Sequence, residues 1–381
     1  MKSLPFILMF ALINSCIELE ISAPSFPDIL VALKTSESMV GLTITYNLIG
    51  FCVASLIYGP LSDCFGRRKI MLIGNGILVI GAVACVIAMS IKWLLFARII
   101  QGIGAATSAV VVSAIIADVY KTEQATKLYG LMNAVFSIMM AVAPIIGGMI
   151  NYQIGWRGNY GVVAIICAIS WFLIYLLLPE TKTGTEKVKI NGLINSYKKL
   201  FSSVSFLSAA AAPSLLYGGY MAFVAIAPFI YMNRFNLDMA SYTFSQGAII
   251  ASFAITSAVF GQIISILGKK MTLLVATCLP FIGGIMMIFS TSSFGLTISM
   301  SIFSVGFALI YPIILTYSIE IFPDIKGVAS SVIMSLRYLL CSIITGIATY
   351  VYNGNPRVIG IVMSIVATTV CMLYYVLFKK I

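Results

Sequence analysis

Apolar segments of about 20 residues follow one another along almost the whole chain, and they constrain its fold more than any other feature. Each is long enough to cross the hydrocarbon core of a bilayer, about 30 Å thick, as an α-helix. With 61% hydrophobic and only 9% charged residues, the chain could not cover itself with polar groups in water. We predict an all-α integral membrane protein with twelve spanning helices, at about 4–27, 40–60, 70–90, 94–117, 128–150, 158–178, 205–232, 243–266, 271–290, 294–318, 328–351 and 357–378.

Basic residues are distributed unequally between the segments that connect these spans. With the N-terminus in the cytoplasm, sixteen fall on the cytoplasmic side: Lys2, Arg67, Arg68, Lys69, Lys121, Lys127, Lys182, Lys187, Lys189, Lys198, Lys199, Lys269, Lys270, Lys326, Lys379 and Lys380. Five fall on the outer side: Lys34, Lys92, Arg157, Arg234 and Arg357. The bias predicts a protein of the cell inner membrane with both termini in the cytoplasm. We interpret the net charge of +11 as a topology signal, with membrane lipid and not nucleic acid as its partner.

Residues that support catalysis or metal binding are scarce. The chain contains no histidine, the commonest metal ligand and general base. Its eight cysteines form no C-x-x-C pair and fall mostly within the spans, where a thiol packs as a small apolar side chain. We therefore expect neither a metal site nor an enzyme. No G-x-x-x-x-G-K-[ST] loop for a nucleotide occurs either, so we expect no cofactor and an ion gradient as the energy source.

The two halves of the sequence are related by an internal repeat. The least apolar stretch, residues 182–203, divides the predicted spans six and six. Pairs of residues separated by 202 positions are Gly59 and Gly261, Gly66 and Gly268, Arg67 and Lys269, Arg68 and Lys270, Gly104 and Gly306, and Asp118 and Glu320. A constant offset across several loops and helices is hard to obtain by chance. We predict a six-helix half at 1–181, a cytoplasmic linker at 182–203 and a parallel six-helix half at 204–381.

Several short motifs carry a family resemblance. They are Gly59-Pro60-Leu61-Ser62-Asp63 with Gly66-Arg67-Arg68-Lys69, Arg98-Ile99-Ile100-Gln101-Gly102-Ile103-Gly104, Ala143-Pro144-Ile145-Ile146-Gly147-Gly148, Leu178-Pro179-Glu180-Thr181 and Pro24-Ser25-Phe26-Pro27. Over nearly its full length the chain resembles the major facilitator superfamily of transporters. Within that superfamily it is similar to the drug:proton antiporters of the bicyclomycin-resistance (Bcr/CflA) type. The resemblance implies a twelve-helix fold that works by alternating access.

The loop between the second and third spans combines small and charged residues. Gly59 and Gly66 permit a tight reversal of the backbone, and Asp63 can pair with Arg67 or Arg68. By the resemblance, this motif is a polar latch that holds the halves together on the cytoplasmic side. The alternative is that its bases only enforce topology. In the fifth span, Pro144, Gly147 and Gly148 are expected to supply a kink and close helix contacts.

Two acids, Glu18 and Glu20, lie inside the first span. Because they are two residues apart on a helix, their side chains project about 200° apart and cannot both face one cavity. The resemblance implies that Glu20, four residues before Pro24, binds protons or cationic drugs, although the family has an aspartate there. Burial favours the neutral carboxyl and an approaching cation favours the carboxylate, so this competition can couple proton release to substrate binding. Glu18 is expected to be a secondary or packing acid.

Two arginines also lie inside spans. A charge at the bilayer centre costs roughly 2.5–3.5 kcal/mol, so each arginine needs a partner or a water-filled cavity. Arg98, in the motif with Gln101, Gly102 and Gly104, is implied by the resemblance to tune an acid during proton transfer; the alternative is a fold support that snorkels or bonds to carbonyls. Arg337 departs from the family, and it can pair with Glu18 or Glu20 or bind an anionic substrate.

Aromatic residues in the seventh span, with Tyr217, Tyr220 and Phe223 among them, are candidates to line an apolar cavity, or they serve packing alone. We predict a monomeric secondary transporter that exports drugs or other small molecules in exchange for protons. Two alternatives are a proton-coupled carrier of an organic anion or siderophore, and a membrane receptor or scaffold that does not transport.

Overall fold

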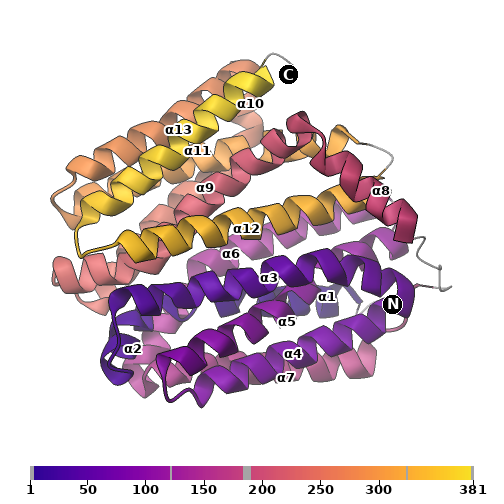
Figure 1. Cartoon of the computed structure of the whole chain (residues 1–381), viewed down its shortest axis with the longest axis horizontal. Helices are drawn as coiled ribbons and strands as arrows, with labels where there is room; N and C mark the ends of the chain where they lie inside the picture. Colours follow the sequence, from indigo (N-terminus) through magenta and orange to yellow (C-terminus); the bar gives the residue numbers. More distant parts are fainter. Residues whose placement is uncertain (1–3, 121, 183–189, 323–324, 379–381) are drawn as a thin grey trace. The chain divides into compact units, whose positions relative to one another are not determined.

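The computed structural model describes residues 4–120, 122–182, 190–322 and 325–378. All regular secondary structure in these ranges is helical (Figure 1). Contacts between residues divide the chain into two units, which are described separately below. Some bases of the charge count lie outside the described residues or have side chains outside them: Lys2, Lys121, Lys127, Lys187, Lys189, Lys326, Lys379 and Lys380.

Unit 1 consists of Met1–Thr35 and Tyr46–Leu193. Its helices are α1 (Leu4–Glu20), η1 (Ala23–Ser25), α2 (Phe26–Ala32), α3 (Glu37–Phe65, whose first residues belong to unit 2), α4 (Arg67–Val86), α5 (Ile91–Val119), α6 (Thr122–Ile154) and α7 (Trp156–Leu177). These elements account for the first six predicted spans.

The first predicted span, 4–27, is not one continuous helix. α1 ends at Glu20, a short 3-10 turn follows at Ala23–Ser25, and α2 begins at Phe26. Pro24 lies in the first turn of η1, where its missing amide hydrogen leaves no helical bond unmade. The interruption places Glu20 at the end of a helix and not in the middle of one.

Unit 2 consists of Ser36–Thr45 and Ile194–Ile381. Its helices are α8 (Ile190–Phe201, whose first residues belong to unit 1), α9 (Val204–Pro228), the π-helical η2 (Phe229–Arg234), α10 (Met239–Phe289), α11 (Ser293–Glu320), α12 (Lys326–Val351) and α13 (Pro356–Phe378). α10 contains two spans in sequence, because Gly268 adopts a non-helical conformation with φ 74° inside it.

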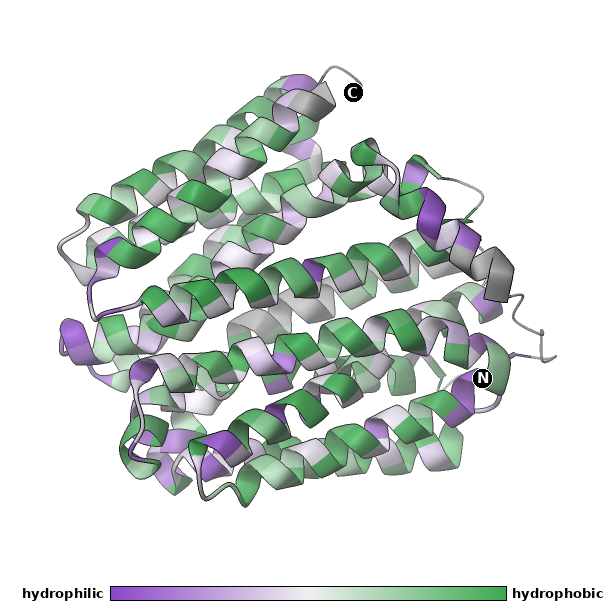
Figure 2. Cartoon of the chain, in the orientation of Figure 1, coloured by the Kyte–Doolittle hydropathy of each residue, from purple (hydrophilic) through white to green (hydrophobic). Residues whose placement is uncertain are grey.

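Ten helical stretches of the described residues are long and apolar enough to cross a membrane, and most of the ribbon has the colour of hydrophobic residues (Figure 2). One of the ten, α10, is two helices joined at Gly268. α6, with 33 residues, supplies a further helix of sufficient length. Counted in this way, the structure has the twelve spanning helices that the sequence predicts.

The internal repeat extends to close contacts between helices within each unit. A Cβ atom at Gly104 would collide with the backbone of Leu78, and one at Gly306 would collide with the ring of Pro280. Gly104 and Gly306 are 202 residues apart, and so are their neighbours Leu78 and Pro280. The glycines thus allow the same close approach of α5 to α4 in unit 1 and of α11 to α10 in unit 2.

The turn between α3 and α4 differs from the prediction at one glycine. Gly66 has φ 93° and separates Phe65, the last residue of α3, from Arg67, the first residue of α4. Gly59 lies inside α3 and takes no part in the reversal, although the sequence suggested that both glycines would. Its carbonyl oxygen accepts a hydrogen bond from the Ser62 hydroxyl group at 2.8 Å.

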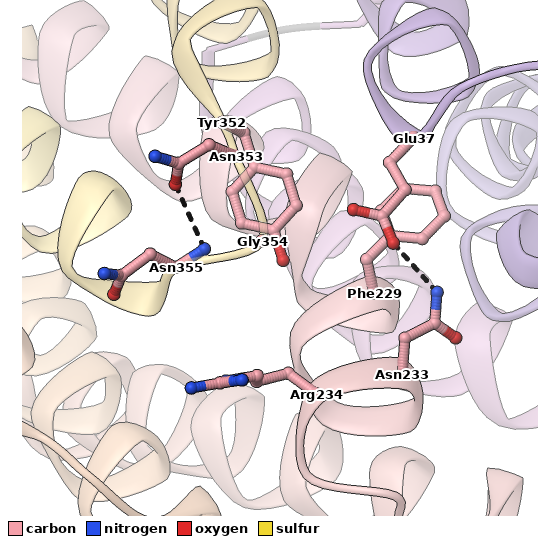
Figure 3. Close-up of a pocket in the computed structure, with 8 residues that line it drawn as sticks. All are labelled: Glu37, Phe229, Asn233, Arg234, Tyr352, Asn353, Gly354 and Asn355. Atoms are coloured by element: carbon pink, nitrogen blue, oxygen red, sulfur yellow. Dashed lines mark hydrogen bonds between the residues drawn. The ribbon is translucent and has the colours of Figure 1, made fainter.

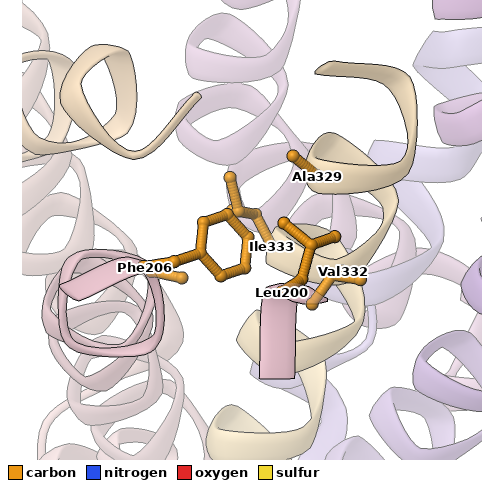
Figure 4. Packing of buried hydrophobic residues seen from close by; sticks show 6 residues of the cluster. Leu200, Phe206, Ala329, Val332 and Ile333 are labelled. Carbon is orange, nitrogen blue, oxygen red and sulfur yellow. The ribbon is translucent and has the colours of Figure 1, made fainter. Parts of the chain in front are cut away.

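The end of the predicted linker packs on unit 2. Leu200 of α8 is buried together with Phe206 of α9 and with Ala329, Val332 and Ile333 of α12 (Figure 4). The last turn of α8 is therefore a fixed part of unit 2. Residues 183–189 of the linker lie outside the described residues.

Candidate functional site

A buried ion pair joins α1 to α5 in unit 1. Arg98 Nη1 lies 3.0 Å from Glu18 Oε2, and the same nitrogen donates to the Glu18 carbonyl oxygen at 3.1 Å. Arg98 is 0% exposed and Glu18 is 1% exposed, so within unit 1 Arg98 is buried and does not snorkel; its bond to a carbonyl fits the other form of the fold-support alternative, and its role in proton transfer stays a prediction. Each charge depends on the other for compensation, and Arg98 bonds to a carbonyl as well.

Two amides surround this pair. Asn47 of α3 donates to Glu18 Oε2 at 3.0 Å, and Gln101 Oε1 accepts from Arg98 Nη1 at 2.7 Å. Gly102 brings α5 against α3 at this point, because a Cβ atom there would collide with the Asn47 carbonyl oxygen. Asn47 was not identified from the sequence; the signal that could have found it is an amide in the middle of an apolar span.

Glu20 has a different environment from Glu18. It is 1% exposed, and neither of its carboxyl oxygens has a hydrogen-bond partner among the described residues. It ends α1, directly before the interruption of the first span. The structure thus separates the two acids into one that is bonded to Arg98 and one that is unbonded. The role of Glu20 in proton or drug binding stays a prediction.

The glycine-rich motif of α6 packs against the backbone that follows Glu20. A Cβ atom at Gly147 would collide with the Ile21 carbonyl oxygen, so only glycine permits this contact. Pro144 lies inside α6 and is buried, as is Gly148. The motif therefore lies beside the interruption of the first span, at Ile21, the residue that follows Glu20 in the sequence.

A cluster of charges lies where α3 ends and α4 begins. Arg67 forms ion pairs with Asp63 at 2.7 Å and with Asp118, the last acid of α5, at 2.8 Å. Lys182 Nζ reaches Asp63 at 3.0 Å. The structure thus pairs Asp63 with one of the two arginines that the sequence offered. All these bonds lie inside unit 1, and a latch between the halves stays a prediction.

The first turn of α4 is closed by an acid from beyond α7. Glu180 Oε1 accepts from the backbone N–H of Arg67 at 2.9 Å, and Glu180 Oε2 accepts from that of Arg68 at 3.2 Å. A carboxylate at this end compensates the free N–H groups and the positive end of the helix dipole. The Arg68 guanidinium donates to the Tyr175 carbonyl oxygen at 2.7 Å. The sequence placed Glu180 in a motif but did not predict this contact.

Arg337 of α12 is buried in unit 2, with 7% exposure. Its Nη2 donates to the Tyr311 hydroxyl oxygen at 2.7 Å, and its guanidinium carbon lies 4.9 Å from the Tyr311 ring centroid and 6.0 Å from that of Tyr217. Within the described part of unit 2, no carboxylate forms an ion pair with Arg337. Its neighbours there are phenol rings, and the sequence did not identify Tyr311 as one of them.

The aromatic candidates of α9 pack inside unit 2. Tyr217 and Tyr220 are each 4% exposed, and Phe223 is 0% exposed. The ring of Tyr217 lies 6.4 Å from that of Phe307, and the ring of Phe223 lies 6.4 Å from that of Tyr231, between centroids. These contacts are ordinary aromatic packing. A cargo cavity lined by the three residues stays a prediction.

Comparison with known proteins agrees with this architecture. The profile of the Major Facilitator Superfamily matches residues 8–346. An uncharacterized MFS-type transporter of Bacillus subtilis is 28% identical over 99% of this chain and 96% of its own length. A bicyclomycin resistance protein homolog of Haemophilus influenzae is 25% identical over 84% of this chain and 82% of its own. Multidrug resistance protein D of Escherichia coli is 25% identical over 92% and 89%, respectively.

Solved structures resemble the whole fold. The crystal structure of a D-xylose-proton symporter superposes with a TM-score of 0.78 and 14% identity, over 97% of both chains. That of the human organic anion transporter TETRAN superposes with a TM-score of 0.71 and 15% identity, over 99% of both. At such identities the likeness concerns the fold alone.

Proposed function

Because the chain belongs to the Major Facilitator Superfamily and is therefore a secondary transporter and not an enzyme, we propose that it exports drugs or other small molecules in exchange for protons. Relatives named for bicyclomycin and multidrug resistance, similar over most of their length, support the export of drugs. The proposal places the protein in the cytoplasmic membrane with both termini inside. The proton gradient then supplies the energy.

The unbonded state of Glu20 is the observation that carries the proposal. Glu18 is already bonded to Arg98 and Asn47, so its charge is compensated within unit 1. Glu20, buried and without a hydrogen-bond partner among the described residues, is the acid whose protonation costs no ion pair. A cationic group of the cargo near Glu20 would favour its charged form and expel the proton.

The pair of Glu18 and Arg98 has a supporting part in this proposal. It fixes the end of α1 to α5 through two bonds that Arg98 donates to Glu18, while Gln101 of α5 accepts a third bond from Arg98. The interruption after Glu20 and the contact of Gly147 with Ile21 lie at the same end of α1. Movement of α6 against this break would change the surroundings of Glu20, as alternating access requires.

Proton movement in proteoliposomes tests the proposal. Wild type, Glu20→Gln and Arg337→Gln are challenged with lipophilic cations, neutral antibiotics and organic anions, with Glu320→Gln as the control because Glu320 is an acid of unit 2, at the end of α11. We expect cations or neutral drugs to drive proton release in wild type and in the control, and Glu20→Gln to abolish it. Drug-driven proton release that persists in Glu20→Gln would contradict the assignment of Glu20.

A second candidate function rests on Arg337. Its described partners in unit 2 are Tyr311 and Tyr217, which leave its positive charge uncompensated there. A guanidinium of this kind suits a carboxylate or other organic anion, and a siderophore would be one such cargo. In the same assay, a response to anions alone that is lost in Arg337→Gln would favour this function. If no variant changes transport or binding, the result would favour a receptor or scaffold.

A further inference from the structure

A pocket of about 460 Å³ opens in unit 2 where three helix ends meet (Figure 3). Its walls come from the start of α3, from η2 and from the connection between α12 and α13, and they consist of Glu37, Phe229, Asn233, Arg234, Tyr352, Asn353, Gly354 and Asn355. The volume falls in the range of small-molecule sites, about 300–1,000 Å³. It lies at the ends of the spans.

The pocket holds one acid and one base that do not pair with each other. Glu37 Oε1 accepts from Asn233 Nδ2 at 2.9 Å, which leaves most of its acceptor capacity free. In the part of the chain that the structure describes, Arg234 forms no ion pair, with Glu37 or any other acid. Opposite charges that share a pocket without pairing can each bind one end of a ligand.

Both charges act on the same hydroxyl group. The pKa of Tyr352 is raised, first by burial and then by Glu37, whereas Arg234 opposes the shift. The Tyr352 hydroxyl group and the amides of Asn353 and Asn355 add neutral donors and acceptors to the wall of the pocket. The site is thus polar, with Phe229 as its apolar surface.

We propose that this pocket binds a small dipolar molecule, with its oxyanion on Arg234 and its ammonium group on Glu37. A guanidinium binds phosphate or carboxylate through two parallel hydrogen bonds, and a carboxylate is the natural partner of an ammonium group. Phosphoethanolamine has both groups on a two-carbon spacer. It occurs free and as a lipid headgroup, and a pocket at the ends of membrane spans is accessible to either source.

Calorimetry on the full-length protein in detergent tests soluble binding, with phosphoethanolamine as the probe. In parallel, nanodiscs with phosphatidylethanolamine or with phosphatidylglycerol test lipid retention by native mass spectrometry. We expect Arg234→Gln and Glu37→Gln each to weaken binding at least tenfold. Arg357→Gln, which removes an exposed arginine at the same end of unit 2 but outside the pocket, is the matched control and should bind as wild type does.

The outcomes separate the two sources. Saturable binding of free phosphoethanolamine identifies a soluble ligand, and selective retention of phosphatidylethanolamine alone identifies a lipid headgroup. Either result supports the proposal if both variants weaken the binding at least tenfold. No binding in either arm, or equal binding by wild type and both variants, overturns the proposal. So does methyl phosphate binding as tightly as phosphoethanolamine, because Glu37 then contributes nothing.

A variant in which the two charges of the pocket are exchanged distinguishes loss of the binding site from misfolding. Arg234→Glu combined with Glu37→Arg keeps both charges in the pocket, so a dipolar ligand should bind again in the reverse orientation. The proposal is contradicted if this double variant has the melting temperature of wild type but binds phosphoethanolamine as weakly as the single variants do. The measurement needs no transport, so it stands or fails independently of proton-coupled export.

Discussion

At the scale of single residues, the environment of each carboxyl group decides its role. Glu18 and Glu20 are two positions apart and equally buried, yet Glu18 bonds to Arg98 and Asn47 while Glu20 has no hydrogen-bond partner among the described residues. A neutral amide can replace an unbonded carboxyl group at little cost. It cannot replace a carboxylate that compensates a buried guanidinium.

Glu18→Gln should therefore destabilise the protein more than Glu20→Gln. Removing one partner of a buried ion pair costs roughly 3–5 kcal/mol, because the remaining charge is uncompensated. We expect a marked fall in melting temperature, measured in detergent by intrinsic fluorescence, for Glu18→Gln and a small change for Glu20→Gln. The double variant Glu18→Leu/Arg98→Met should recover much of the loss, since it leaves no orphaned charge. Equal effects of the two glutamine variants would contradict the pairing seen in the structure.

The need of Arg98 for a partner could be predicted from the sequence, because a charge inside an apolar span is costly. The choice of Glu18 as that partner could not. It depends on how α1 is rotated against α5 and on where α1 ends, and both follow from packing across the unit. The partner of Asn47 could not be predicted for the same reason, although an amide in the middle of an apolar span is itself a signal.

At the scale of elements, the start of α4 combines a backbone requirement with a side-chain contact. Gly66 has φ 93°, a region that disfavours residues with a Cβ atom. A Cβ atom there would also collide with the Glu180 carboxylate, which accepts from the first N–H groups of α4. Its repeat partner Gly268 has φ 74°, but a Cβ atom added there would meet no other group of the described residues within 4 Å.

Gly66→Ala should therefore be more harmful than Gly268→Ala. Both variants incur backbone strain, about 1–3 kcal/mol, and only the first also displaces Glu180. We expect a larger fall in melting temperature for Gly66→Ala. In a Glu180→Ala background the difference between the two glycine variants should shrink, because the collision is gone. A greater loss for Gly268→Ala would show that the Glu180 contact does not stabilise the turn.

The sequence predicted the number and order of spans well, because long apolar runs leave few alternatives in a bilayer. It predicted the interior of elements less well. Pro24 lies close to the end of the span predicted at 4–27, so the interruption before it was not distinguished from an ordinary helix end. Gly59 looked like part of a turn, yet α3 continues through it to Phe65.

At the scale of the whole molecule, the two units share a plan but differ at one acid of the charge cluster. The contacts of Gly104 and Gly306 repeat at an offset of 202 residues, whereas Asp63, which pairs with Arg67, corresponds to Ser265. The repeat therefore conserves close helix packing and leaves the ion cluster in unit 1. The difference between Asp63 and Ser265 can be read from the sequence. The pairing of Arg67 with Asp118 and of Asp63 with Lys182 is seen only in the folded structure.

The charge bias predicts the orientation of the chain, and cysteine labelling tests it. In a variant whose native cysteines are replaced, Lys198→Cys on α8 and Thr291→Cys between α10 and α11 place single exposed thiols. With basic segments retained in the cytoplasm, a membrane-impermeant maleimide should label Thr291→Cys on intact cells, and Lys198→Cys only in inside-out vesicles. A permeant maleimide, which should label both in either preparation, is the control. The reverse pattern would place the basic segments outside and would contradict the predicted orientation of the chain.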